Sequence, residues 1–208
     1  MSHIFSKYCG ITTIDDASLA QESGCDAIGL VLVAKSKRYI DLKQAKQIAD
    51  HVRGKTQIVL LFADPKAVEV EQAIAAIEPD ILQFHGYENA EFCSQWKLPY
   101  WKAVPMYDSH EIDVYLQQYQ SAAAWLLDNY GHNKSGGSGE PFQWFRFPEN
   151  FRKKLILAGG LTPQNVYQAI VETGALSVDV SSGIEAAPGI KSAEKMRLFI
   201  EQIRRYDN

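Results

Sequence analysis

The chain has 208 residues and a formal net charge of −4 at pH 7, with 46% apolar and 22% charged residues. This composition is ordinary for a globular protein, and the absence of any Lys/Arg cluster argues against a nucleic-acid partner. The longest apolar run, residues 28–34, is too short to cross a bilayer, so we expect no membrane partner. The length suits one domain spanning residues 1–208.

Eight short runs of β-branched and apolar residues predict strands, each followed by a helical or turn segment. They cover residues 5–9, 26–32, 57–62, 80–84, 100–104, 124–128, 154–157 and 176–180. Helical spacing predicts helices over 41–52, 65–77 and 163–173, the last with Thr162 as N-cap and Pro163 at the first position. We therefore predict a single (β/α)8 TIM barrel. An open doubly wound sheet is the alternative, but it usually needs fewer strands.

Two glycine-rich segments, residues 157–163 and 179–185, follow the last two predicted strands. Glycine lets backbone N–H groups approach a ligand closely, and a helix that starts behind such a loop adds unpaired donors and a positive dipole end. Two such loops on successive strands are typical of a phosphate site in a β/α barrel. A small phosphorylated metabolite is therefore the expected ligand.

The carboxyl ends of barrel strands are where chemistry is expected, and Cys9 ends the first strand. Strand alternation places Lys7 and Cys9 on one face and Tyr8 on the other. A nearby cation favours a thiolate, and Gly10 is expected to open space beside the sulfur. A small buried hydrophobe is the alternative interpretation of Cys9, and Cys25 and Cys93 are assigned to packing.

Asp128 ends an apolar strand, where a partly desolvated carboxyl group can act as a general acid; capping the next turn is an equally good interpretation. Arg38 lies in a basic loop and is a natural bidentate partner for a substrate carboxylate, although such a side chain is more often only solvated. For His85, a hydrogen-bonded histidine at a strand end is favoured over proton transfer. Lys102 and Asp179 are weaker candidates. The segment 129–141 resembles a mobile loop, with residues 136–139 as a flexible lid.

The chain resembles the phosphoribosylanthranilate isomerase family, (β/α)8 enzymes of tryptophan biosynthesis. The matching segments span nearly the whole length and occur in order at the expected strand ends. They are residues 7–12, 36–40, 83–86, 136–139 with Phe142 and Trp144, 157–161 with Asn165 and Val166, 179–185 and 188–191.

The resemblance implies an Amadori rearrangement of N-(5-phosphoribosyl)anthranilate to the open-chain 1-deoxyribulose 5-phosphate derivative, with no metal or organic cofactor. It implies Cys9 as general base, Asp128 as general acid and Arg38 as the partner of the anthranilate group. The remaining substrate-binding residues are expected to be Lys7, His85 and Asp179. The phosphate-binding residues are expected to be Gly159, Gly160, Ser182 and Gly183.

Two alternatives stay open. The related sugar isomerase of histidine biosynthesis performs the same rearrangement, but it uses an Asp base on the first strand and two phosphate sites, whereas this chain has Cys9 and one convincing phosphate clamp. A catalytically silent barrel that binds a phosphorylated ligand is the other alternative, against which the presence of both Cys9 and Asp128 speaks. The three cysteines form no CxxC pair and the N-terminus has no secretory signal, so we expect a cytoplasmic protein with reduced thiols. The sequence leaves a monomer and a homodimer both open.

Overall fold

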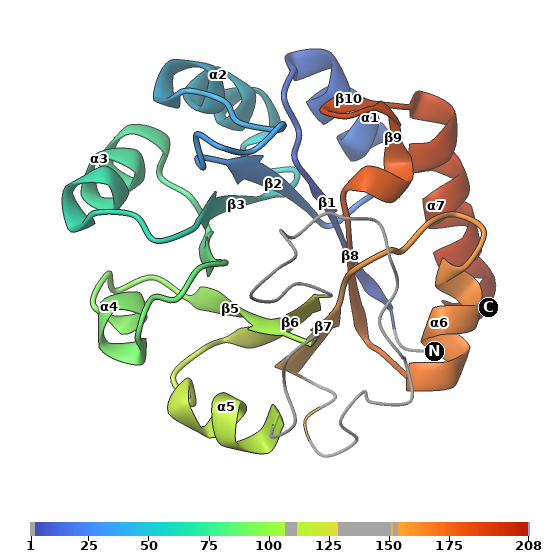
Figure 1. The fold of residues 1–208 in the computed structure, drawn as a ribbon. Coiled ribbons are helices and arrows are strands. Elements are labelled where there is room, and N and C mark those ends of the chain that lie inside the picture. The colour runs from blue at the N-terminus through green and yellow to red at the C-terminus, as the bar shows by residue number, and fades with distance from the viewer. Residues whose placement is uncertain (1–2, 107–111, 129–150, 152–153, 208) are drawn as a thin grey trace.

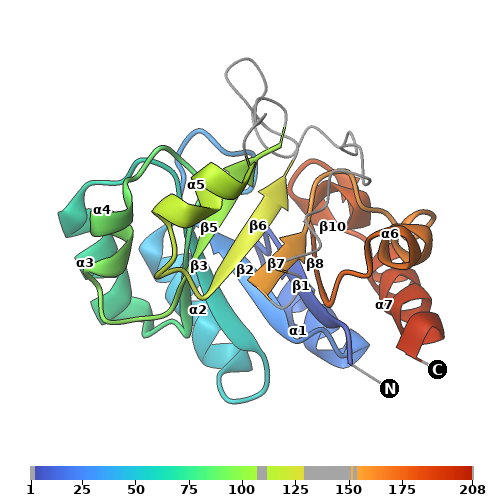
Figure 2. The same cartoon turned by 90° about the horizontal axis from the view of Figure 1, so that it is seen from below.

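Eight parallel strands close into a barrel surrounded by helices, which confirms the predicted TIM barrel (Figure 1). The computed structural model describes residues 3–106, 112–128, 151 and 154–207. The barrel strands are β1 (Phe5–Cys9), β2 (Ala27–Val31), β3 (Gln57–Phe62), β4 (Ile81–Phe84), β5 (Tyr100–Pro105), β6 (Ala124–Asp128), β7 (Leu155–Leu157) and β8 (Ser177–Val180). Neighbouring barrel strands pair in parallel throughout, and Figure 2 shows β6 and β7 running in the same direction.

The helices pack outside the strands, and several begin at a side chain that caps the first turn. Thr13, Asp41 and Asn89 each accept a hydrogen bond from a backbone N–H three residues on, as expected of N-cap residues. The helices are α1 (Ile14–Ser23), α2 (Leu42–Val52), α3 (Ala67–Ile77), α4 (Ala90–Ser94), α5 (Ile112–Gln118), α6 (Val166–Thr173) and α7 (Ala193–Asp207). Among the residues described, no helix combines the length and apolar character needed to cross a membrane.

The predicted helix start at Thr162 and Pro163 is wrong, because α6 begins at Val166. The side chain of Asn165 accepts a hydrogen bond from the Thr162 N–H at 2.7 Å and donates one to the Gly160 carbonyl at 2.9 Å. These bonds hold residues 162–165 as a turn before the helix begins.

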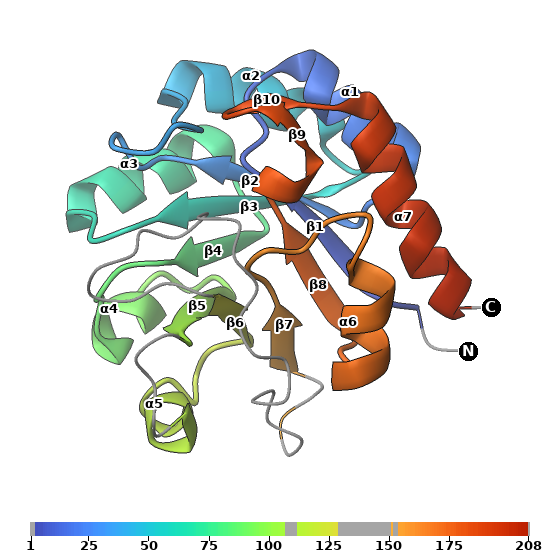
Figure 3. The same cartoon turned by 45° about the vertical axis from the view of Figure 1, so that its right-hand side comes forward.

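The second glycine-rich segment also departs from the prediction, since it leads into a single turn and not into an α-helix. The turn is a 3₁₀ helix, η3 (Ser182–Ile184), and an antiparallel hairpin of β9 (Glu185–Ala187) and β10 (Ile190–Lys191) follows it. Figure 3 shows this hairpin beside the start of α7. We refer to residues 185–191 below as the β9–β10 hairpin.

Strand alternation divides the core into two layers. A small inner cluster fills the barrel, where the rings of Phe5 and Trp101 meet edge to face. A larger outer cluster lies between the strands and the helices. Nearer the carboxyl ends, Cys9 packs against Val31 and Leu61 on the inner face. The side chain at a given strand position therefore faces either the lumen or the helices, and this choice decides whether it can reach a ligand.

Tyr8 faces the helix layer, as alternation predicts, although it lies between two lumen residues. Its ring packs edge to face on Phe199, and its hydroxyl donates a 2.5 Å hydrogen bond to the backbone carbonyl of Met196 in α7. Burial raises the pKa of the Tyr8 hydroxyl well above its usual value, so the group serves as a neutral donor. Tyr8 thus joins β1 to α7.

We predict that Tyr8→Phe lowers the free energy of unfolding by about 1 kcal/mol, the typical net value of one buried hydrogen bond. Urea unfolding followed by circular dichroism measures this loss. Tyr206→Phe, at a partly exposed position of α7, is the control and should change stability little. A Tyr8→Phe variant with altered catalytic constants would show that the side chain reaches the lumen.

Candidate active site at the carboxyl ends of the strands

A buried ion pair lies in the lumen beneath the mouth of the barrel. Lys7 on β1 and Asp179 on β8 are direct cross-strand partners, and their side chains meet with Nζ 2.6 Å from Oδ1. Lys7 is fully buried. Burial lowers the pKa of Lys7, but Asp179 and Cys9 outweigh this effect and raise it above its usual value. The ammonium group is therefore a permanent positive charge inside the barrel.

Cys9 lies two residues after Lys7 on the same inward face, and the space for its sulfur comes from Gly29 on β2. A Cβ atom at Gly29 would lie 2.9 Å from the Cys9 Sγ and 3.0 Å from the Lys7 Cε, so only glycine fits there. The expectation that Gly10 opens this space is wrong. Gly10, with a φ of +75°, leaves room for the side chain of Arg38, whose Cγ would lie 2.8 Å from a Cβ.

Lys7 lowers the pKa of the Cys9 thiol, as expected of a nearby cation, but the pKa is raised overall. Burial is the largest effect and raises the pKa; Lys7 and Lys191 lower it, while the Asp179 carboxylate raises it. The cation is present as predicted, but Asp179 neutralises it and Cys9 is buried. In the free protein Cys9 is therefore a protonated thiol near neutral pH.

Asp128 ends β6 and alternates with inward-facing Ala124 and Leu126, so its carboxyl group lies on the lumen side. His85, which follows β4, lies next to it, with Nε2 3.2 Å from the Oδ2 of Asp128. The buried Gln83 contacts the other ring nitrogen of His85 at 3.2 Å. The structure thus brings the predicted residues His85 and Asp128 together.

Arg38 reaches the barrel mouth from the loop after β2 and is held by a carboxylate from the other side of β1. Its Nε and Nη2 donate 2.8 Å hydrogen bonds to the two carboxylate oxygens of Glu185, a bidentate arrangement. Burial raises the pKa of Glu185, but Arg38 and Lys191 outweigh this effect and lower it below its usual value. Arg38 is therefore a fixed side chain, in contrast to the solvated loop residue that was the alternative.

Lys191 links the Arg38–Glu185 pair to the backbone at the ends of β1 and β8. Its buried Nζ donates to the backbone carbonyl of Cys9 at 2.7 Å, to that of Ser181 at 3.0 Å and to Glu185 at 3.1 Å. Thr12 donates from the loop after β1 to the Gly189 carbonyl at 3.0 Å. The β9–β10 hairpin consequently connects the loops after β1, β2 and β8.

The two glycine-rich loops lie directly against each other. A Cβ at Gly183 would collide with the backbone carbonyl oxygen of Leu161, so the close approach of the loops requires glycine there. Gly159 and Gly160 both have positive φ, +75° and +69°, which lets the first loop turn sharply at the end of β7. Ser182 begins the short η3 turn of the second loop. The four predicted phosphate-binding residues therefore lie in two loops in direct contact.

Several sequence predictions lie outside the described residues, namely the segment 129–141 with the lid residues 136–139, and the matching residues Phe142 and Trp144. The residues that the structure describes hold no group of three or more His, Cys, Asp or Glu side chains suited to a metal ion.

Lys102 lies on the helix side of β5, away from the lumen, since it alternates with the inner residues Trp101 and Ala103.

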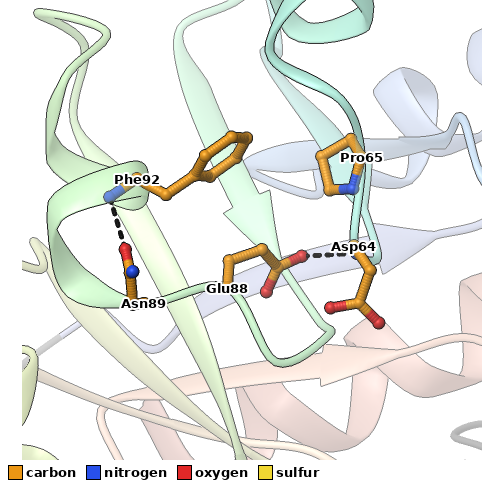
Figure 4. A pocket seen from close by; sticks show the side chains of 5 residues that line it. All are labelled: Asp64, Pro65, Glu88, Asn89 and Phe92. Carbon is orange, nitrogen blue, oxygen red and sulfur yellow. Dashed lines mark hydrogen bonds between the residues drawn. The ribbon is translucent and has the colours of Figure 1, made fainter.

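A recess of about 290 Å³ lies beside the site, outside the barrel lumen (Figure 4). Its lining comes from the loops after β3 and β4 and from α4, and none of the predicted catalytic side chains takes part. The lining residues are Asp64, Pro65, Glu88, Asn89 and Phe92.

The sequence pattern indicated no role for Glu185, Lys191 or Gly29. Glu185 and its partner Arg38 are 147 positions apart, so no local pattern announces the pair. The matching segments 179–185 and 188–191 did include Glu185 and Lys191, which was the available indication. Gly29, in the middle of a strand, could have indicated a close approach by another residue.

A closed parallel barrel with a thiol, a carboxyl group and an arginine at the carboxyl ends of its strands, next to paired glycine loops, defines an enzyme of the (β/α)8 class. The model of the N-(5'-phosphoribosyl)anthranilate isomerase family matches residues 6–202. The chain belongs to this family.

Known relatives match this chain over nearly its full length. The chain is 44% identical to the N-(5'-phosphoribosyl)anthranilate isomerase of Nitrosomonas eutropha over 202 residues, 97% of each chain. The phosphoribosyl anthranilate isomerase from Thermotoga maritima superposes with a TM-score of 0.87 at 33% identity, over 99% of this chain and 100% of the other. A phosphoribosyl anthranilate isomerase solved with reduced 1-(o-carboxyphenylamino)-1-deoxyribulose 5-phosphate has a TM-score of 0.82 at 31% identity, with the same coverage.

We predict that two substitutions in the lumen change the reactivity of Cys9 in opposite directions. Asp179→Asn removes a carboxylate that raises the thiol pKa, so alkylation at pH 7.5 should become faster; Lys7→Met removes a cation that lowers it, so alkylation should become slower. Iodoacetamide labelling with mass spectrometry of the Cys9 peptide measures both rates.

Cys25 and Cys93 are internal references in the same experiment. Burial raises the pKa of each to about 12, and neither Lys7 nor Asp179 contributes to either shift. Circular dichroism checks that both variants fold. Equal rates for Cys9 in the two folded variants would contradict the electrostatic account of its pKa.

Proposed function

We propose that this chain catalyses the isomerisation of N-(5'-phosphoribosyl)anthranilate to the 1-(2-carboxyphenylamino)-1-deoxyribulose 5-phosphate product in tryptophan biosynthesis, with Cys9 as general base and Asp128 as general acid. The family membership supports the reaction. The observation that carries the residue assignment is the inward direction of both side chains from strands on different sides of the lumen, β1 and β6, separated by β7 and β8.

The ends of the substrate match the chemistry around these two groups. A relative has been solved with a reduced form of the phosphorylated product. We assign the phosphate group to the touching loops that carry Gly159, Gly160, Ser182 and Gly183, since backbone N–H groups in such loops suit an oxyanion. Arg38 is the partner of the anthranilate carboxylate. The hydrogen bonds to Glu185 use its Nε and Nη2, so Nη1 can be the donor to a ligand.

The reaction needs one acid and one base. Asp128 donates a proton to the ring oxygen of the ribose, the ring opens, and a protonated Schiff base forms at C1′. The positive nitrogen makes the C2′ proton acidic, and Cys9 removes that proton to give an enolamine, which tautomerises to the ketone. No atom is gained or lost, so the reaction is an isomerisation that requires no redox cofactor.

The surroundings of Cys9 fit this sequence of events. In the free protein burial raises the pKa of the thiol, which keeps it neutral. A cationic Schiff base beside the sulfur lowers the pKa of Cys9, because an opposite charge favours the thiolate. The thiol proton then leaves to water, and the thiolate formed in this way accepts the C2′ proton. Lys7 and Asp179 fix the charge below it, and their direct contact with substrate stays a prediction.

Family membership disfavours the histidine-pathway isomerase as the function of this chain. The silent phosphate-binding barrel is tested by the variants below. The cytoplasmic location, the monomer or homodimer, and the absence of a metal or cofactor remain predictions.

We predict that Cys9→Ser and Asp128→Asn each lower kcat by about 10²-fold or more, because each removes one proton-transfer group. The measurement is the cofactor-free loss of fluorescence of phosphoribosylanthranilate generated in situ. Wild-type protein is assayed in parallel with and without EDTA, and the two rates should agree.

Cys25→Ser is the matched control, since Cys25 lies in the outer layer of the core and should keep full activity. Turnover that survives in both Cys9→Ser and Asp128→Asn would contradict the acid–base assignment. A wild-type protein that binds the product analogue but shows no turnover would favour the silent barrel.

We predict that Glu185→Gln raises KM about tenfold with a smaller change in kcat. The neutral amide weakens the charge-assisted hydrogen bonds that orient Arg38, and such bonds contribute about 1.5–3 kcal/mol each. Steady-state kinetics separates the two constants.

Lys195→Met is the control for Glu185→Gln. Lys195 donates to the backbone carbonyl of Glu185 at 2.6 Å and leaves the carboxylate and Arg38 untouched. Its KM should stay near the wild-type value. If both variants raise KM equally, the effect comes from the hairpin as a whole and not from the orientation of Arg38.

A further inference from the structure

Lys102 is a fully buried lysine that cannot touch the substrate. It lies on β5 between the inner residues Trp101 and Ala103, so it points to the layer between the barrel and the helices. Its Nζ lies 5.5 Å from the centre of the Tyr119 ring, which belongs to that layer. Since burying an ammonium group costs several kcal/mol, the contacts that Lys102 makes need an account of their own.

The ammonium group of Lys102 binds the backbone on both sides of His85. Its Nζ donates to the Gly86 carbonyl at 2.5 Å and to the Phe84 carbonyl at 3.4 Å. These two residues are the immediate neighbours of His85 in the chain. A single cation therefore binds the peptide group that precedes the histidine, 84–85, and the peptide group one residue after it, 86–87.

Glu88 completes this arrangement and neutralises the charge. Its Oε2 accepts from Lys102 at 3.0 Å and from the Gly86 N–H at 3.0 Å, and its Oε1 accepts from the Asp64 N–H at 2.8 Å. Figure 4 shows the last bond, which ties the loop after β4 to the loop after β3. A Cβ at Gly86 would lie 2.5 Å from Oδ1 of Asp64, so the two loops are packed to the limit. The segment 84–88 thus has little freedom to shift.

The effect on His85 is to direct its ring to Asp128. The backbone N–H of His85 donates to the Phe62 carbonyl at 2.8 Å, which fixes the residue from a third side. Its Nδ1 lies 3.2 Å from the Nε2 of Gln83 and its Nε2 lies 3.2 Å from the Oδ2 of Asp128. With the amide of Gln83 as donor, the proton of a neutral His85 ring resides on Nε2, facing the carboxyl group of Asp128.

We propose that Lys102 is a positioning residue, which acts from behind the barrel wall by holding the peptide groups around His85 and thereby the orientation of Asp128. The proposal deepens the proposed function, on which the kinetic part of its test rests. A purely structural role for the Lys102–Glu88 pair is the competing account, and it predicts a loss of stability alone.

The principal variant is the double substitution Lys102→Met with Glu88→Gln, which removes both charges together and leaves no unpaired ion in the core. We expect kcat to fall about tenfold, at the lower end of what loss of a well-placed acid costs, with KM changed less than about threefold. Lys102→Gln is made alongside, since its amide can donate to Glu88 but is too short to reach both carbonyls. Lys102→Gln should also lower kcat, and it serves as the test if the double variant does not fold.

Coupling to His85 distinguishes positioning from a general structural effect. If Lys102 acts through His85, the loss in kcat of Lys102→Gln and that of His85→Asn should not multiply when the two are combined. Tyr100→Phe is the matched control, because it removes a partly buried hydrogen bond to Ser121 from the same face of β5 and keeps the ring that packs on Phe84. It should lose stability and keep kcat.

A readout that needs no turnover keeps this proposal separate from the proposed function. The ring ¹⁵N signals of His85, assigned by their loss in His85→Asn, should shift in Lys102→Gln and stay unchanged in Tyr100→Phe. If Lys102→Gln shifts the His85 ring signals but the wild-type protein shows no turnover, the positioning role is supported and the proposed function is refuted. Unchanged ring signals, an unchanged kcat in a folded variant, or losses that multiply would each overturn the proposal.

Discussion

The mouth of this barrel depends on one constraint, the neutralisation of buried ammonium groups. In the part of the chain that the structure describes, three lysines are buried, and each meets a carboxylate from another segment: Lys7 with Asp179, Lys102 with Glu88 and Lys191 with Glu185. A buried charge without a partner costs far more than a surface one. Each pair therefore fixes two segments relative to each other, at the ends of the strands where the reacting groups lie.

The three pairs serve different parts of the site. Lys7 and Asp179 set the electrostatic field under Cys9. Lys191 and Glu185 hold the β9–β10 hairpin, Arg38 and the backbone of Cys9 in one network. Lys102 and Glu88 act from the helix side on the loop that carries His85. Since Lys102 and Lys191 also donate to backbone carbonyls, these two ammonium groups hold loops in place in addition to pairing with a carboxylate.

Burial of Cys9 also explains why its thiol stays protonated in the free protein. Burial raises the pKa of Cys9, and the neutralised Lys7 offsets only part of this effect. A substrate that becomes cationic during the reaction changes this balance at the moment when a base is needed. Asp128, held beside His85 on the other side of the lumen, is separated from Cys9 by two strands, so acid and base do not neutralise each other.

The sequence by itself determined the barrel, most strand bounds and the inward direction of Cys9 and Asp128, because strand periodicity is local. It could also place Gly159 and Gly183 in facing loops. Only the tertiary structure decided that Gly29 makes room for the sulfur, that Arg38 is bound by Glu185 and that Cys9 has a raised pKa. The start of α6 depended on the side-chain bonds of Asn165. These features arise from burial and from contacts between distant segments, which no local pattern contains.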